Sequence, residues 1–272
     1  MVGKLIATDL RQSWRPIVIA SALVIAFTTL GGLLVGFKVP FFASIFSLLI
    51  VIAPFALLAG ILVYLLVRYY RTMYGRVGYF THSLPATGAQ LFWAKLLYGL
   101  IAMTIALVAA VIALQPVWMS LLASNDIPLS EGPRMLADQL ATMPKGFWPV
   151  SIAMLLVTVL GYIIHYQFVI SVGSEARLNH LGIGGPVVVY VLVYLAGQII
   201  SLVSFVAIPL MVRIDSGFHI ETGSAWQFIV DSMSKTAPPN VIPIGWAPAQ
   251  VIMLIALAWW TIRSIRLHTS LR

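Results

Sequence analysis

The sequence has 272 residues, of which 61% are hydrophobic and only 9% are charged. A soluble domain carries roughly 25% charged residues, so this composition excludes a domain whose whole surface faces water. The formal net charge of +8 suggests a nucleic-acid-binding protein, but the positions of the charges along the chain argue against that class. Cysteine is absent, which excludes disulfides, thiol catalysis and thiolate metal sites.

Residues 1–15 are predicted to form a short amphipathic helix that lies in the cytoplasmic interface of a membrane. Its apolar side chains recur at helical spacing and are Val2, Leu5, Ile6, Leu10 and Trp14. Its polar face comprises Lys4, Thr8, Arg11, Gln12 and Arg15. Pro16 then suits a turn into the first span. The alternative is a basic flank that only orients the first span.

Six long apolar runs follow, and each has the ~20 residues needed to cross ~30 Å of hydrocarbon as a helix. They lack the alternating pattern of barrel strands, so helices are expected. The predicted fold class is an all-α integral membrane protein with one transmembrane domain over residues 1–272. The predicted spans are 17–37, 41–67, 91–123, 148–170, 183–212 and 245–262.

Three connections are predicted to lie outside the cell: a very short turn around residues 38–40 and two longer segments. Residues 124–147 have room for one short helix. Residues 213–244 contain a short apolar stretch around Trp226 and Phe228, which predicts a helix on the outer leaflet or a re-entrant segment within it. Gln115 and Pro116 are expected to kink the third span.

The charges separate by side of the membrane if the N-terminus is cytoplasmic. Eleven of the 16 basic residues then lie inside, whereas only Asp9 and Glu175 among the eight acidic residues do so. An excess of Lys and Arg on the cytoplasmic side orients membrane proteins, so both termini are predicted to be cytoplasmic, and the basic composition requires no nucleic-acid partner. The expected location is the cell membrane of a bacterium.

The cytoplasmic segment 68–90 between the second and third spans is longer than a passive connector requires. Its first part continues the second span as a basic, aromatic helix end, which Gly75 and Gly78 interrupt. Thr87 followed by Gln90 predicts a capping box that opens the third span. The aromatic side chains of this segment favour docking on another protein. The alternative is contact with lipid headgroups.

This segment resembles the permease subunits of type-2 ATP-binding-cassette exporters, in particular the branch that exports antimicrobial peptides and drugs. Those permeases commonly read Glu-Gly-Tyr-Leu-Thr-x-Thr-Leu-Pro-Val-Ser at this place. The matching residues are Gly78, Tyr79, Phe80, Thr81, Leu84 and Pro85, with Lys95 as the basic residue that opens the next span. The motif covers about 25 residues, and the six spans and amphipathic N-terminus also fit. Arg76 and Val77 stand where the family often has acidic residues.

The resemblance implies a non-catalytic subunit whose coupling segment contacts a separate ATPase. The implied contacts are Tyr74, Gly75, Arg76, Gly78, Tyr79, Phe80, Thr81, Leu84 and Pro85, together with Glu175 and Arg177 in the next cytoplasmic loop. Glu175 and Arg177 could instead form a local ion pair. No phosphate-binding loop occurs in this chain, so ATP and Mg²⁺ are expected on the partner. The expected assembly has two ATPases and a second permease, identical or homologous, in membrane lipid.

Polar residues inside the spans are candidates for a translocation path or for structural hydrogen bonds. These residues are Gln115, His165 and Gln198. No carboxylate lies inside a predicted span, which argues against a secondary transporter, and no metal-ligand or nucleophile motif indicates an enzyme. The expected function is ATP-driven export of an amphipathic or hydrophobic peptide, lipid or drug. The alternatives are a transport-inactive sensor or assembly protein, or a secondary transporter.

Overall fold

The computed structural model describes residues 2–39, 41–75, 77–143, 146–182, 184–213, 219–234 and 241–267. Its six long helices are apolar and long enough to cross a membrane. They are α1 (Val2–Gly36), α2 (Phe42–Met73), α4 (Gly88–Ser124), α6 (Phe147–Gly173), α7 (Gly184–Ala207) and α9 (Trp246–Leu267). The predicted six-helix fold class is confirmed, with a small sheet in addition.

Large apolar side chains are exposed along all six helices. Examples are Leu23, Leu48, Ile152, Leu202 and Ile252, whose exposed fractions lie between 62% and 68%. Water-soluble monomers do not expose apolar surface on this scale, whereas a bilayer solvates it. The exposed apolar surface and the lengths of the helices therefore both indicate that these helices lie in a membrane.

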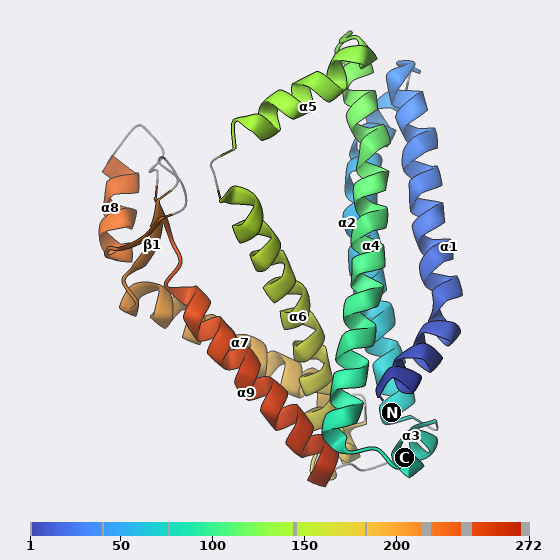
Figure 1. The fold of residues 1–272 in the computed structure, drawn as a ribbon, viewed down its shortest axis with the longest axis vertical. Helices are drawn as coiled ribbons and strands as arrows, with labels where there is room; N and C mark the ends of the chain where they lie inside the picture. The colour runs from blue at the N-terminus through green and yellow to red at the C-terminus, as the bar shows by residue number, and fades with distance from the viewer. Residues whose placement is uncertain are drawn as a thin grey trace. The chain divides into compact units, whose positions relative to one another are not determined.

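The chain forms two compact units. The first contains α1, α2, the part of α4 from Trp93 onward, the 3₁₀ helix η1 (Leu129–Glu131) and α5 (Gly132–Ala141). In Figure 1, α1, α2 and α4 run side by side. The predicted short helix in the external loop 124–147 is confirmed by α5.

The three long helices of the first unit pack through small residues and an apolar cluster. Val35, Ile50 and Val117 form the buried cluster, with Phe46 against it. A side chain at Gly32 would meet the carbonyl oxygen of Pro116 at 3.0 Å, so α1 approaches α4 where Pro116 lies inside α4. Glycine at this position permits close contact between the helix backbones.

The N-terminal segment is not separated from the first span. Residues 2–36 form one continuous helix with Pro16 inside it, so the predicted turn at Pro16 is wrong. Figure 1 shows that α1 changes direction near its N-terminal end. Proline removes one helical hydrogen bond and can bend a helix without ending it. The burial of this segment agrees with the predicted amphipathic pattern only in part. Lys4 and Arg11 are exposed and Leu5 and Leu10 are half-buried, but Trp14 of the predicted apolar face is 52% exposed and Asp9 is buried.

The second unit contains α3 (Gly78–Ser83), the first turn of α4, α6, the 3₁₀ helix η2 (Asn179–Leu181), α7, α8 (Ala225–Ser234) and α9. Phe168, Val169, Val189 and Leu257 form its buried apolar cluster. At the turn between α6 and α7, a side chain on Gly185 would collide with the carbonyl oxygen of Gly173. The glycine-rich connection therefore allows two helix ends to meet backbone to backbone.

The predicted fifth span ends too late. Helix α7 ends at Ala207, and residues Leu210–Arg213 form strand β1 instead of helix. Pro209 explains the difference, because proline disfavours helical geometry in the residue before it and donates no hydrogen bond. This signal was present in the sequence.

The segment that follows α7 contains a three-stranded sheet that the sequence analysis did not predict. Its strand order is β2 (His219–Thr222), β1, β3 (Val241–Pro243), and both pairings are antiparallel. Arg213 donates two hydrogen bonds of 2.8 Å to Glu221 across the sheet. The predicted short helix around Trp226 is confirmed by α8, whereas residues 214–218 and 235–240 lie outside the described part.

Candidate functional site

The predicted coupling segment consists of the end of α2, the short helix α3 and the start of α4. Helix α2 continues to Met73, and α3 begins at Gly78. The capping box is confirmed in both directions. The Thr87 backbone N–H donates to Gln90 Oε1 at 3.0 Å, and the Gln90 N–H donates to Thr87 Oγ1 at 3.3 Å. The N–H groups of Thr87 and Gln90 are thereby satisfied at the point where the long helix begins.

Helix α3 presents an apolar aromatic surface. Tyr79 is 55% exposed and Phe80 is 75% exposed, and Val77 just before them is also exposed. Gly78 is buried, so the side of α3 that contains this glycine packs against the rest of the protein. We call Val77, Tyr79 and Phe80 the α3 face. Exposed aromatic side chains of this kind are enriched at the centres of protein interfaces.

The remaining predicted coupling residues divide into buried and exposed groups. Tyr74 is 3% exposed, with its ring 6.5 Å from that of His82. Gly75 and Thr81 are half-buried, whereas Leu84 and Pro85 are exposed. Arg76 lies outside the described residues. Tyr74 therefore supports the local fold, and the exposed residues remain available for contact.

Glu175 and Arg177 line a small groove in the second unit together with Trp259, Trp260 and Arg263. The guanidinium of Arg263 lies 5.6 Å from the Trp259 ring centre. No ion pair between Glu175 and Arg177 is found among the described residues, so the structure adds no support to the local-pair alternative. Their predicted contact with an ATPase stays a prediction.

The three polar residues predicted for a translocation path have different surroundings. Gln115 on α4 and Gln198 on α7 are exposed, whereas His165 on α6 is half-buried with its ring 6.0 Å from that of Tyr190. A fourth polar residue, Gln167, was not predicted and is fully buried on α6. Its side-chain amide has no hydrogen-bond partner among the described residues.

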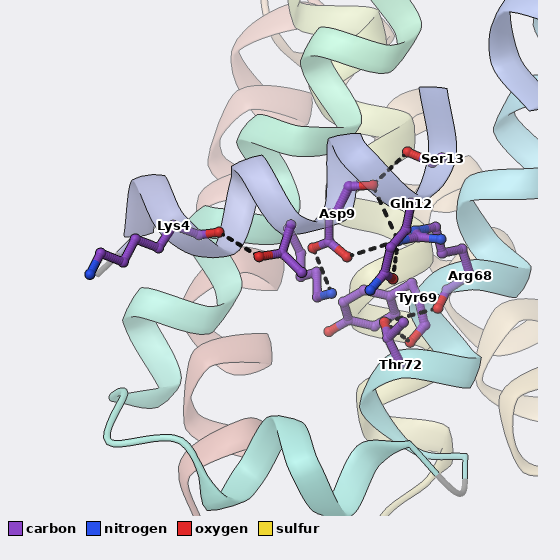
Figure 2. Close-up of polar contacts among 9 residues, drawn as sticks. Lys4, Asp9, Gln12, Ser13, Arg68, Tyr69 and Thr72 are labelled. Atoms are coloured by element: carbon purple, nitrogen blue, oxygen red, sulfur yellow. Dashed lines mark hydrogen bonds and ion pairs between the residues drawn. The ribbon is translucent and has the colours of Figure 1, made fainter. Parts of the chain in front are cut away.

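A buried charge cluster joins α1, α2 and α4 inside the first unit. Asp9 is 6% exposed and Lys95 is 8% exposed. Lys95 Nζ lies 2.8 Å from Asp9 Oδ2, and Arg68 Nη2 lies 3.2 Å from Asp9 Oδ1. Figure 2 shows Asp9, Gln12 and Arg68 in this arrangement. We call Asp9, Arg68 and Lys95 the charge cluster.

Neighbouring groups complete the cluster. Arg68 Nη2 also donates to Gln12 Oε1 at 3.0 Å and to the Asp9 carbonyl oxygen at 3.2 Å. The Ser13 hydroxyl donates to that same carbonyl at 2.7 Å, and the Tyr98 ring centre lies 5.6 Å from the Arg68 guanidinium. The single carboxylate of Asp9 thus pairs with two cations, Arg68 and Lys95. The cluster therefore has a formal charge of one positive unit.

The cluster places a buried carboxylate on the helix that contains the first span, although Asp9 precedes residue 17, where that span was predicted to begin. Asp9 lies within α1, the continuous helix that contains the first span. The signal was available, since Asp9 is the sole acidic residue before Asp126 and lies one helical turn from Ser13. Its partners could not be inferred because they lie 59 and 86 residues away.

The fold and these sites define a multi-pass membrane protein, by the length and hydropathy of its helices. Comparisons with protein-family models, with curated proteins and with solved structures found no match to this chain. The resemblance to type-2 exporter permeases therefore rests on the residues of the coupling segment and on the six-helix architecture.

Proposed function

We propose that this chain is the permease subunit of an ATP-driven exporter, and that a separate ATPase subunit binds the α3 face. The substrate class that suits the apolar spans is an amphipathic or hydrophobic peptide, lipid or drug. A second permease, identical or homologous, would complete the assembly. The α3 face is the observation that carries this proposal.

The geometry of the coupling segment supports force transmission. Residues 74–77 connect α2 to α3, and residues 84–87 connect α3 to α4, where the capping box fixes the first turn of the helix. A push on α3 by ATPase closure would therefore reach two long helices. Within the first unit, the charge cluster connects both of these helices to α1.

The test compares two phenylalanines of similar exposure. Phe80 is 75% exposed on α3, and Phe37 is 77% exposed just beyond the end of α1. The tagged chain is purified from its native membrane, and the co-purified protein is identified by its phosphate-binding loop. We expect Phe80→Ser to reduce the recovered ATPase and its ATP hydrolysis by at least about tenfold, the size of an interface hot spot.

The control variant Phe37→Ser should retain the ATPase at the wild-type level. Equal recovery with both variants would refute docking on the α3 face. If wild-type protein brings down no ATPase at all, the exporter proposal itself fails.

Asp9 gives a reason to keep a secondary transporter as the second candidate. An ionisable group buried in a spanning helix is a common feature of ion-coupled carriers. Transport into proteoliposomes separates the two functions, since an exporter requires ATP and the partner subunit. Uptake driven by an ion gradient alone would favour the carrier.

A further inference from the structure

A groove of about 550 Å³ lies between α1 and α2 in the first unit. Small residues open it, chiefly Ala20 on α1 and Ala53, Ala56 and Gly60 on α2. A side chain placed on Gly60 would meet no atom within 4 Å. The lining is almost entirely apolar, so the groove suits a hydrocarbon ligand and not a polar one.

Two arginines follow the groove-lining residues along α2. Gly60, Tyr64, Arg68 and Arg71 recur at intervals of three and four residues, so they share one face of the helix. Arg71 is exposed. Arg68 belongs to the charge cluster, which has one positive charge in excess.

Across the groove, the α1 wall also ends in polar residues. Pro16 lines the groove, and Gln12 lies one turn before it. Gln12 accepts a hydrogen bond of 3.0 Å from Arg68, so the two walls are tied together at this end. Figure 2 shows Gln12 and Arg68 facing each other. The groove is thus apolar along its length, and basic residues lie beyond one of its ends.

We propose that this groove binds one anionic phospholipid, with an acyl chain along α1 and α2 and the phosphate beside Arg71 and Arg68. This inference is independent of the exporter proposal. A helix from a second copy could cover the apolar part, but it would supply no anion to the exposed Arg71 or to the excess positive charge of the charge cluster. An anionic phospholipid supplies both parts, since basic sites between membrane helices bind lipid head groups.

The experiment measures lipid binding to the full-length purified protein by native mass spectrometry. The delipidated protein in detergent receives phosphatidylglycerol or phosphatidylcholine with the same acyl chains. Wild-type protein should retain one phosphatidylglycerol about fivefold more tightly than phosphatidylcholine, the effect of about one basic residue near an anionic head group.

Two variants test the two ends of the groove separately. Gly60→Leu places a side chain in the open space, and it should weaken binding of both lipids by about tenfold because it displaces acyl methylenes. Ala59→Leu is the matched control on an exposed position outside the lining. Arg71→Gln should remove the preference for phosphatidylglycerol, whereas Arg11→Gln, on a residue of the exposed polar face of α1, should retain it.

Three results would overturn the proposal. The first is equal retention of both lipids by wild-type protein. The second is unchanged phosphatidylglycerol binding in both Gly60→Leu and Arg71→Gln. The third is a dimer that Gly60→Leu dissociates while lipid binding is unaffected, since a helix of a second copy would then occupy the groove.

Discussion

Asp9 is the residue on which three helices of the first unit converge. It accepts contacts from Lys95 on α4 and Arg68 on α2, and all three side chains are largely buried. A buried ionic group contributes to stability only while it is paired, because an unpaired buried charge is costly. The cluster therefore specifies the relative register of α1, α2 and α4.

Asp9→Asn should lower stability by about 3 kcal/mol, because it leaves two buried cations without their anion. Thermal unfolding of the detergent-purified protein measures this loss. The matched control is Asp126→Asn. Asp126 pairs with Lys38 at 2.6 Å, but the two side chains are 82% and 50% exposed. The control should cost about 0–1 kcal/mol.

If both asparagine variants lowered the unfolding temperature equally, the cluster would have no greater structural role than a surface pair.

At the scale of elements, the coupling segment depends on how α4 begins. Thr87 and Gln90 satisfy each other's backbone N–H groups, so the helix starts at a defined residue directly after the turn that follows α3. A frayed start would absorb a displacement of α3 instead of passing it to α4. The cap therefore matters for the proposed coupling as well as for stability.

Thr87→Ala should cost about 1 kcal/mol, the usual effect of losing a threonine N-cap. Amide hydrogen exchange at Gln90 and Leu91 should accelerate, and this is the measurement. Thr104→Ala in the same helix is the control, since the Thr104 hydroxyl only donates to the carbonyl of Leu100 one turn earlier. Faster exchange in the control than in Thr87→Ala would contradict the role of the cap.

At the scale of the whole molecule, the distribution of Lys and Arg predicts the orientation in the membrane. The absence of cysteine makes this testable, since a single introduced cysteine is the sole thiol. Ser83 at the end of α3 and Ser130 in η1, just before α5, are both exposed. The orientation places them on opposite sides of the membrane.

A membrane-impermeant maleimide added to intact cells should label Ser130→Cys and leave Ser83→Cys unlabelled. Permeabilised cells should show labelling of both variants. The opposite pattern in intact cells would reverse the predicted topology, and it would also place the α3 face on the side that lacks ATP.

Much of the helical architecture could be predicted from the sequence. The six long helices follow from apolar runs, because a backbone in lipid must satisfy its hydrogen bonds within its own segment. The cap of α4, the short helix α5 and the helix α8 follow from equally local signals. The errors at Pro16 and near Val212 concern proline, whose effect depends on context: it bends α1 but ends α7.

The sequence by itself determined that this is a membrane protein with six long apolar helices, and where its short helices α5 and α8 lie. Such features depend on residues within a turn or two of one another and on the solvent around them. Only the tertiary structure decided that Asp9 faces Lys95 and Arg68, that β1 lies between β2 and β3, and that small residues leave a groove between α1 and α2. These features join residues distant in the chain, so they depend on how the helices pack.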